Sequence, residues 1–597
     1  MARGRVVTLV AVLSALVLLL ACARAAPTPT PTKAPPTATP TTAPVVGAAT
    51  ATPTRVVAVV LTPTPTRVPA TPTPTAKREP RGTLNVIAGV GTENWLTRTS
   101  TEEQPLSLLG EPLVWWDWEK DAPVAKAVLE SWQVTNNADG SRDYTLKIRK
   151  GVKYHKGWGE VTAEDVKFSL EQVSKPGSVN ANTRRWTDFY GKDPNNMVVV
   201  DQYTLKVHEP KGQSFIELFR TFSAEEPRSL RPMPKKYFEQ VGEQEFAQKP
   251  IFAGPYEYVS ARRGYDLLLK AVPDFYRVTQ GFAEVHYFKV LEEATKVAML
   301  RSGQIDIAAV AALLAPELKA AGITVAVSEN GAEPFVALGG LFPDRPKCDP
   351  TSPWVGGCKG TDMLADRPTK VRKALNLVVD RQAIVDKIQA GYGETGVISF
   401  SYISSKFPWW NPDWKPLPYD PKQAKQLLAE AGYPNCFEFN FWYISNMSLS
   451  AEIGEAVVST WEKELGCKIN RRLGEYTPVL RTMLVERNTA GWAYLFRGSP
   501  IARPFRYACL HGGPTYEVIT HTELPFYSEI CPQIEKTVDI AEQVRLERQI
   551  GDLEYKYFPT VAVSLLHTPF GVGPKVKEWT PMPKKTDPGL LDYAIPK

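Results

Sequence analysis

Alternating apolar and polar residues mark a pair of strands early in the chain. Trp132 and Val134 flank a polar residue, and residues 144–148 (YTLKI) repeat the alternation after the turn pair Asp139-Gly140. A period of two on both sides of such a turn predicts a β-hairpin. Residues 82–90 predict a short strand before it. After the hairpin, Thr162 with Asp165 three positions on predicts a helix N-terminus.

Helical spacing dominates the second half of the chain. Apolar residues at 371, 374, 375 and 378 follow the spacing of one helix face, and Asp380 is placed to cap a second helix that ends at Gly391. Asp420-Pro421 opens a further helix that Gly432 ends. Residues 437–443, 451–465 and 468–473 then predict a strand, a helix and a strand, a β-α-β unit with parallel strands.

The N-terminus carries an export signal. Arg3 and Arg5 precede an apolar run over residues 6–21, too short for a membrane span, and the sequence LLAC ends in Cys22. The next 58 residues, 23–80, hold 30 Pro or Thr and cannot bury a core. We therefore expect a signal peptide over residues 1–22 and an extended, disordered stalk over residues 23–80.

The remaining 517 residues are too many for one core and predict two or three domains. Residues 1–80 hold 8 of the 70 basic and 1 of the 64 acidic residues, so residues 81–597 keep 62 against 63, a net charge of about −1. The basic balance of the whole chain comes from the signal and stalk. It gives no argument for nucleic-acid binding.

Six cysteines remain once Cys22 is set aside, an even number that favours disulfides in an exported chain. Sequence alone allows fifteen pairings. Cys348 with Cys358 would close a Pro/Gly-rich loop, Cys436 with Cys467 would join the starts of the two strands that flank one helix, and Cys509 is left with Cys531. The scattered histidines and the lack of C-x-x-C spacing predict no metal site.

Taken together, these local patterns resemble the family 5 extracellular solute-binding proteins, the oligopeptide, dipeptide and nickel-binding relatives of ABC importers. The stretch LLAC around Cys22 is similar to the lipobox of bacterial lipoproteins, in which the cysteine is acylated. The motifs that carry the family resemblance run over most of the folded chain: 127–132 (AVLESW), 144–155 (YTLKIRKGVKYH), 162–166 (TAEDV), 253–256 (AGPY), 300–306 (LRSGQID), 371–375 (VRKAL) with Asp380-Arg381, and 419–433.

The resemblance implies an α/β chain with a type II periplasmic-binding-protein fold: two lobes, a hinge and an extra inserted α+β domain. We expect lobe I in residues 81–113, 247–330 and 552–597, the inserted domain in 114–246, and lobe II in 331–551. Of the motif residues, His155, Asp165 and Asp306 are expected to fix turns and caps. The implied function is a substrate-binding lipoprotein that captures a peptide or peptide-like solute between closing lobes.

The resemblance also implies partners and a location. We expect a monomer, held to the membrane by a lipid at Cys22 as an exported cell-surface or periplasmic protein, which serves the membrane subunits of an ABC importer. No cofactor and no nucleic-acid partner are expected. The alternative is a binder of a non-peptide anionic solute or metal complex.

Peptide-binding relatives pair the ligand ammonium with an Asp in a Trp-x-x-Asp-Tyr stretch, which residues 491–497 (GWAYLFR) resemble. Leu495 stands in place of that acid, which predicts weak binding of free-amino peptides and a gain for the Leu495→Asp variant. Arg497, Arg503 and Arg506 favour an anionic ligand. The full set of expected ligand-binding residues is Glu93, Asn94, Trp95, Trp492, Tyr494, Leu495, Arg497 and Arg503, with Glu93 as a substitute acid.

An enzyme finds little support in the sequence. Residues 391–396 match G-x-G-x-x-G, but they follow a predicted helix and not a strand, so the phosphate-binding context is missing. No G-x-S-x-G or H-E-x-x-H motif occurs, and His511-Gly512-Gly513 lacks a nucleophile. A secreted hydrolase is the distant alternative, and no catalytic residue is predicted.

Overall fold

The computed structural model describes residues 79–89, 95–96, 98, 104–180, 182–224, 229–399, 407–445, 449–475, 479–498, 509 and 522–597. The chain forms two units, Met1–Val57 and Ala58–Lys597, and all the described residues belong to the second. The predicted signal segment, Cys22 and nearly all of the predicted stalk lie outside the described residues.

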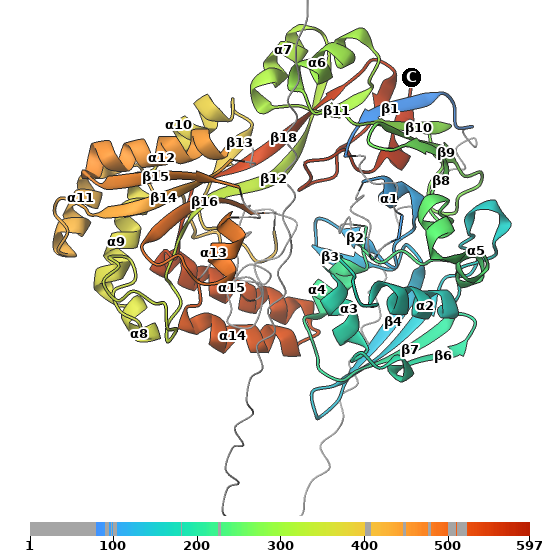
Figure 1. The fold of residues 1–597 in the computed structure, drawn as a ribbon, viewed down its shortest axis with the longest axis horizontal. Helices are drawn as coiled ribbons and strands as arrows, with labels where there is room; N and C mark the ends of the chain where they lie inside the picture. The colour runs from blue at the N-terminus through green and yellow to red at the C-terminus, as the bar shows by residue number, and fades with distance from the viewer. Residues whose placement is uncertain are drawn as a thin grey trace, which may run out of the picture. The chain divides into compact units, whose positions relative to one another are not determined.

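One mixed sheet of twelve strands organises the described residues (Figure 1). Its main path runs in the order β15, β14, β16, β12, β18, β11, β1, β10, β9, β8, while β13 pairs with β18 and β17 with β12. In the same order, the bounds are β15 Lys468–Gly474, β14 Glu438–Ile444, β16 Trp492–Gly498, β12 Thr324–Leu338, β18 Ser564–Val572, β11 Ile307–Ala309, β1 Thr83–Ile87, β10 Glu284–Phe288, β9 Asp266–Ala271, β8 Tyr256–Arg262, β13 Gly393–Thr395 and β17 Thr560–Ala562.

A separate sheet of four antiparallel strands lies in the range predicted for the inserted domain. It follows the order β4 (Leu129–Asn136), β5 (Arg142–Ile148), β7 (Thr204–Glu209), β6 (Met197–Asp201). The β4–β5 pair is the hairpin predicted from the alternating pattern. Two small sheets join β2 (Trp115–Asp117) to β3 (Ala122–Val124) and β19 (Val576–Glu578) to β20 (Ile595–Pro596).

Two of the predicted helix starts are confirmed by their caps. Thr162 forms a reciprocal capping box with Asp165, and Asp420 accepts a hydrogen bond from the Gln423 N–H at the start of the helix after it. The helices are α1 Gln104–Leu109, α2 Ala163–Val173, α3 Thr183–Phe189, α4 Phe215–Thr221, α5 Lys235–Gln248, α6 Glu293–Ser302, α7 Ala315–Ala320, α8 Gly360–Met363, α9 Asp366–Leu377, α10 Arg381–Ala383, α11 Pro421–Glu430, α12 Ser450–Leu465, α13 Arg481–Val485, α14 Pro525–Lys536 and α15 Ile540–Tyr557.

The predicted helix after Asp380 is only partly right. Asp380 caps α10 as expected, but from Ile384 to Ile388 the chain widens into a π-helical turn, with the Gln389 N–H donating to the Ile384 carbonyl five residues back. Capping residues identify where a helix starts. They do not determine whether each later N–H donates to the carbonyl four or five residues back.

The predicted β-α-β unit is confirmed. The parallel strands β14 and β15 flank α12, whose buried face consists of Ile453, Val457, Trp461 and Leu465 at steps of four residues. The Trp461 indole donates to the Leu375 carbonyl of α9 at 2.9 Å, which joins the helices of this layer. Gly466, at φ 77°, ends α12 in a left-handed conformation that glycine adopts without strain.

The apolar core divides into two large clusters. The first gathers β1, β4, β5, β9 and β10 together with Phe570 and Leu591 near the end of the chain. The second lies between Val336 and Leu565 and contains the buried faces of α9, α12, α14 and α15. Val538, in the connection between α14 and α15, packs into the first cluster. The predicted domain boundaries remain a prediction.

None of the helices in the described ranges combines the length and the apolar character that a membrane crossing requires.

Candidate functional site

The parallel strands of the two halves of the sheet point toward each other. β11 and β12 are both antiparallel to β18, so they run in one direction, and β1 is parallel to β11. β16 is antiparallel to β12, and β14 is parallel to β16. Because β12 leads from the β11 side to the β16 side, the carboxyl ends of β1 and β11 face those of β14 and β16. Carboxyl ends of parallel strands are where α/β proteins bind ligands.

Two long strands connect these halves. β12 pairs with β18 through residues 324–328, shifts register between Ser328 and Ala332, and then pairs with β16 from Glu333 onward. β17 and β18 make the return crossing, pairing with β12 along both parts. The interruption of pairing lies where the two halves meet, and there the backbone is least constrained by the ladder.

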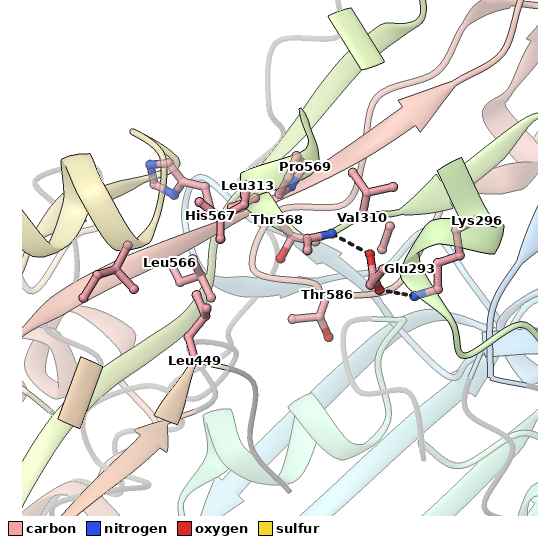
Figure 2. Close-up of a pocket in the computed structure, with 14 residues that line it drawn as sticks. Glu293, Lys296, Val310, Leu313, Leu449, Leu566, His567, Thr568, Pro569 and Thr586 are labelled. Atoms are coloured by element: carbon pink, nitrogen blue, oxygen red, sulfur yellow. Dashed lines mark hydrogen bonds and ion pairs between the residues drawn. The ribbon is translucent and has the colours of Figure 1, made fainter. Parts of the chain in front are cut away.

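A pocket of about 240 Å³ lies at this junction (Figure 2). The α6 side contributes Glu293 and Lys296, while Leu449 and Leu566 lie on the opposite side. The remaining wall residues come from β11 and the segment after it, from the π-helical turn, from β18 and from the C-terminal segment: Ala309, Val310, Ala311, Ala312, Leu313, Ile388, His567, Thr568, Pro569 and Thr586. The pocket thus receives residues from both halves of the sheet.

Three of the polar side chains of this pocket already have partners. Glu293 accepts hydrogen bonds from Lys296 Nζ at 2.6 Å and from the Ala311 backbone N–H at 2.8 Å. His567 Nε2 lies 3.5 Å from a carboxylate oxygen of Glu394. The rest of the wall is mainly aliphatic, which suits an apolar group of a solute. No nucleophile and general base of a hydrolase meet among these wall residues.

Trp95 does not contact this pocket. Its side chain is 1% exposed, its ring packs edge-on against Tyr258 with 6.1 Å between centroids, and its backbone N–H donates to the Ala247 carbonyl. The expected ligand contact is therefore a core position of the first cluster. Large aromatic side chains satisfy a core as readily as a binding surface, and sequence does not distinguish the two.

Trp492 is exposed enough to contact a ligand, as predicted. It starts β16, is partly exposed, and its ring lies 5.4 Å from that of Trp442 on β14. Both tryptophans lie on parallel strands of the second half. Its contact with a ligand remains a prediction.

Leu495 and Tyr494 are buried, which corrects the prediction built on them. Leu495 is 1% exposed and lies opposite Val336 in the core cluster that α12 covers. Tyr494 is fully buried on the opposite face, against Phe335 and Leu484. An acid at Leu495 would be buried among apolar side chains, so the expected gain from Leu495→Asp is withdrawn. The resemblance identified the correct strand, β16, but the face to which the Leu495 side chain points depends on the register of that strand.

Most of the other expected ligand residues lie outside the described part of the chain. Glu93, Asn94, Arg503 and Arg506 lie outside the described residues, and so does Cys22. Arg497 belongs to β16 and lies opposite Pro334 on β12, but its side chain is not among those described. The roles predicted for these residues stay predictions.

The motif residues expected to be structural are so, but only Asp165 caps a helix, and Asp306 and His155 instead join segments far apart along the chain. The Asp306 carboxylate accepts the Asn85 backbone N–H at 2.9 Å, and His155 Nε2 lies 3.0 Å from the Gly254 carbonyl oxygen. A Cβ on Gly254 would come within 2.2 Å of the Leu108 carbonyl oxygen, so only glycine fits that motif position. Burial lowers the pKa of His155 to about 4, so it is neutral at physiological pH.

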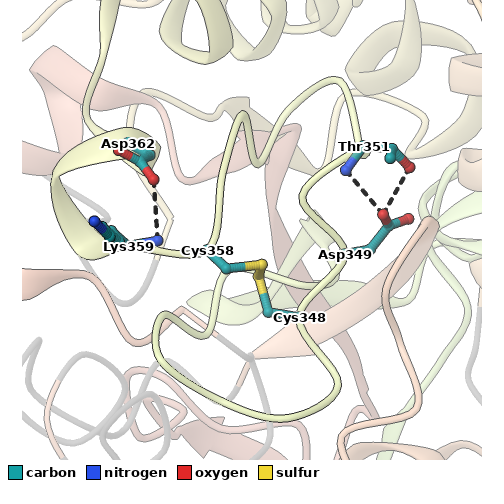
Figure 3. Close-up of a disulfide and its surroundings, with 6 residues drawn as sticks. All are labelled: Cys348, Asp349, Thr351, Cys358, Lys359 and Asp362. Atoms are coloured by element: carbon teal, nitrogen blue, oxygen red, sulfur yellow. Dashed lines mark hydrogen bonds between the residues drawn. A yellow bond between two sulfur atoms is a disulfide. The ribbon is translucent and has the colours of Figure 1, made fainter.

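The three predicted disulfides are present. Cys348–Cys358 closes the loop before α8, where Asp349 accepts two hydrogen bonds from Thr351 and Asp362 accepts one from the Lys359 N–H (Figure 3). Cys436–Cys467 joins the starts of β14 and β15, and Cys509–Cys531 ties residue 509 to α14. All three belong to the second half of the sheet and its helices.

Residues 124–496, more than half of the chain, match the bacterial extracellular solute-binding proteins, family 5 (middle). The chain belongs to this family.

The alignments of this chain with its curated relatives cover only part of each protein. Glutathione-binding protein GsiB of Salmonella choleraesuis is 27% identical over 348 residues, which are 56% of this chain and 58% of that protein. Heme-binding protein A of Haemophilus influenzae is 26% identical over an alignment of 380 residues, which covers 58% of this chain and 61% of that protein. The chain thus spans about three fifths of the curated relatives that it matches.

Solved structures extend the likeness over most of the chain. NikA of Brucella suis, in complex with Fe(III)-EDTA, superposes with a TM-score of 0.68 at 17% identity and covers 86% of this chain and all of that one. At such identity the likeness shows the fold, a type II periplasmic-binding-protein fold with two lobes. The matched relatives and structures are substrate-binding proteins and not enzymes, so the hydrolase alternative is dropped.

The junction pocket was missed by sequence reasoning. Glu293 and Lys296 occupy an ordinary first turn of a helix, and Leu566 and His567 an ordinary strand. One feature of the sequence could have indicated this pocket. Residues 310–313 follow a short strand, β11, and the carboxyl end of a strand parallel to β1 is where a ligand binds. That inference required knowing that β11 pairs in parallel with β1, which the sequence does not show.

Proposed function

We propose that this family-5 chain captures a peptide or peptide-sized solute with an apolar group and delivers it to the membrane subunits of an ABC importer. The observation that carries the proposal is the facing carboxyl ends of β1 and β11 on one side and β14 and β16 on the other, with a largely aliphatic pocket between them. The expected lobe boundary near residue 330 falls within β12, which crosses between the halves, and β18 makes the return crossing, so the hinge would lie in these two strands. Closure would then enclose the solute.

Export and anchoring complete the proposal. Cys22 would be acylated at the membrane and residues 23–80 would form the stalk, so the binding domain would begin near Arg81. A native mass spectrum of the protein purified from its membrane tests both the anchor and the ligand, because it reads the mass added at Cys22 and any co-purified solute. An unmodified Cys22 in exported protein contradicts the anchor alone.

The pocket is tested by calorimetry with glutathione, a tripeptide mixture and the N-acetylated mixture. Leu566→Asp places a charge in the aliphatic wall and should weaken binding at least about tenfold, because an unpaired carboxylate would be desolvated beside the solute. Val198→Asp, at an exposed position on β6, is the matched control and should leave affinity unchanged. Equal affinity of Leu566→Asp and the unmodified protein would place the ligand elsewhere.

A non-peptide anionic solute or metal complex is the second candidate. Arg497, Arg503 and Arg506 follow one another from β16 onward, and the relatives include a heme-binding protein and a structure with Fe(III)-EDTA. Heme and ferric EDTA therefore belong in the same calorimetric series. Binding of either, with none of the peptides, would replace the peptide proposal with this one.

A further inference from the structure

A second pocket lies between the β2–β3 hairpin and the C-terminal segment of the chain. Its volume is about 350 Å³, and it shares no residue with the pocket at the junction of β11 and β18. Its walls are mostly aromatic rings, with one carboxylate: Trp115, Trp118, Glu578, Trp579, Thr580, Leu590 and Tyr593.

The rings are held at angles that form a corner. Trp115 and Trp118 stand at 86° to each other with 6.0 Å between centroids, and Tyr593 is tilted by 56° to Trp115 at 6.3 Å. Trp579 is fixed from behind, since its indole N–H donates to the Gly589 carbonyl at 3.0 Å and its ring packs edge-on against Phe570. The four rings are thus held in place before any ligand enters, which leaves Trp118 and Trp579 as the rings not contacted by Arg277.

Trp115 already binds one cation. The Arg277 guanidinium lies 4.1 Å from the centre of its ring and 5.6 Å from that of Tyr593, whose hydroxyl accepts a hydrogen bond from it at 2.8 Å; Arg277 is not among the residues that line the pocket. Both carboxylate oxygens of Glu111 accept hydrogen bonds from Arg277, and Asp592 accepts a further one at 3.0 Å. The charge of this arginine is therefore fully balanced behind the ring.

Glu578 leaves the pocket with negative charge. It lines the cavity, is exposed, and forms no ion pair with any residue that the structure describes. Neither Lys577, its neighbour on β19, nor Lys120 lines the cavity, and Lys120 lies 3.7 Å from Asp117. An aromatic corner with an unpaired carboxylate at its rim has the chemistry that attracts a large, weakly hydrated cation.

We propose that this pocket is a second binding site, which takes an organic cation of the quaternary ammonium class. Methyl groups on a cationic nitrogen pack against the ring faces, the charge is attracted by the ring quadrupoles, and Glu578 supplies the counter-charge. A small ion such as ammonium keeps its hydration shell and gains less from the rings. The site is independent of the solute that the junction pocket takes.

The test compares choline with 3,3-dimethyl-1-butanol, its uncharged isostere, by calorimetry on the full-length protein. The two have nearly the same shape, so shape and apolar burial contribute equally and the difference reports charge recognition. Choline should bind at least about tenfold more tightly than the alcohol. Equal affinities, or no heat from choline at millimolar concentration, would overturn the proposal.

Two variants place the binding in this pocket. Glu578→Gln keeps the shape of an exposed side chain and should weaken choline several-fold, and Trp118→Leu, which removes one wall, should weaken it further. Glu130→Gln, an exposed glutamate on β4, is the matched control and should bind as the unmodified protein does. Thermal melting checks that each variant is folded. Unchanged choline affinity in a folded Glu578→Gln protein would show that the cation binds elsewhere, and the proposal fails.

Discussion

Each half of the molecule is stabilised internally by a different kind of interaction. All three disulfides lie between residues 348 and 531, in the half built on β14, β15 and β16. In the other half, buried ion pairs take this role: Asp121 accepts hydrogen bonds from Arg220 at 2.9 Å and Lys584 at 3.1 Å, and Glu111 accepts from Arg277, whose side chain is 7% exposed.

The two kinds of tie differ in reach. The disulfides join residues 10, 31 and 22 positions apart, whereas the buried ion pairs join residues separated by 99, 166 and 463 positions. The disulfides therefore stabilise short segments within one half. The ion pairs dock distant segments, the β2–β3 hairpin and the C-terminal segment, onto the rest. No disulfide among the six described cysteines joins the two halves, so a movement of one against the other would break no covalent bond.

Buried arginines show the same contrast. Arg277 sits among carboxylates: burial by itself would lower its pKa, but Glu111 and Asp592 raise the pKa above its ordinary value. In the other half, Arg372 donates to the carbonyls of Tyr557, Trp354 and Met363, and burial lowers its pKa to about 9. Carbonyl dipoles satisfy the donors without neutralising the charge. A buried arginine thus stabilises the fold either through ion pairs, as Arg277 does, or through hydrogen bonds to backbone carbonyls, as Arg372 does.

The largest effect is expected from Asp121→Asn. The change leaves Arg220 and Lys584 buried without the carboxylate that both contact, and it should lower the free energy of unfolding by about 3 to 5 kcal/mol. Asp117→Asn is the matched control: its partner Lys120 is exposed, so a loss of less than about 1 kcal/mol is expected. Urea unfolding measures both. Similar losses would mean that burial of the pair is not what stabilises this half.

Removing the longest disulfide loop should cost slightly less. The chain-entropy relation for a separation of 31 residues gives about 3 to 4 kcal/mol for the double variant Cys436→Ser, Cys467→Ser. Hydrogen exchange should show the loss in β14 and β15 and unchanged protection in β4 and β5. Equal loss of protection in the four-stranded sheet would show that the two halves unfold as one unit.

The smallest effect concerns pH and Glu209. Burial raises the pKa of Glu209 to about 7, against the opposing charge of Arg142. The folded state then binds a proton that the unfolded state releases above its ordinary pKa of 4.5, so stability falls as pH rises from about 4.5 to 7. Glu209→Gln should lack this fall, which amounts to at most about 3 kcal/mol.

Urea unfolding of both proteins at pH 5 and pH 8 measures the difference. The buried His155, with a pKa of about 4, acts in the opposite direction, but it does so equally in both proteins and cancels. Parallel pH profiles for the two proteins would contradict the raised pKa of Glu209.

Local features of the chain could be predicted because their causes lie within a few residues. The β4–β5 hairpin follows from alternation around Asp139-Gly140, the start of α2 from Thr162 and Asp165, and α11 from Asp420-Pro421. The three expected disulfide pairs are present, but sequence alone allowed fifteen pairings and the structure decides among them. Family motifs extended this to the two-lobed fold, since their residues hold the fold together, either as a cap like Asp165 or as a contact between distant segments like Asp306.

The candidate site could not be predicted in the same way. Leu495 lies in the strand that the resemblance identified, yet register turns its side chain into the core under α12. Trp95 looks like a cleft residue in the sequence and is a core residue in the fold. Glu293 and His567 meet in one pocket although they are far apart along the chain, and nothing local distinguishes either from a surface helix or strand residue.

The sequence by itself determined the hairpin, the starts of several helices and the motifs that mark the family, because capping, alternation and spacing act over short distances. Only the tertiary structure decided which strand ends face each other, which tryptophans are buried, and which aromatic rings meet a free carboxylate. Those outcomes depend on strand order, on register and on segments that meet across hundreds of residues, such as Asp121 and Lys584. No short-range pattern encodes them, because each is set by the packing of the whole chain.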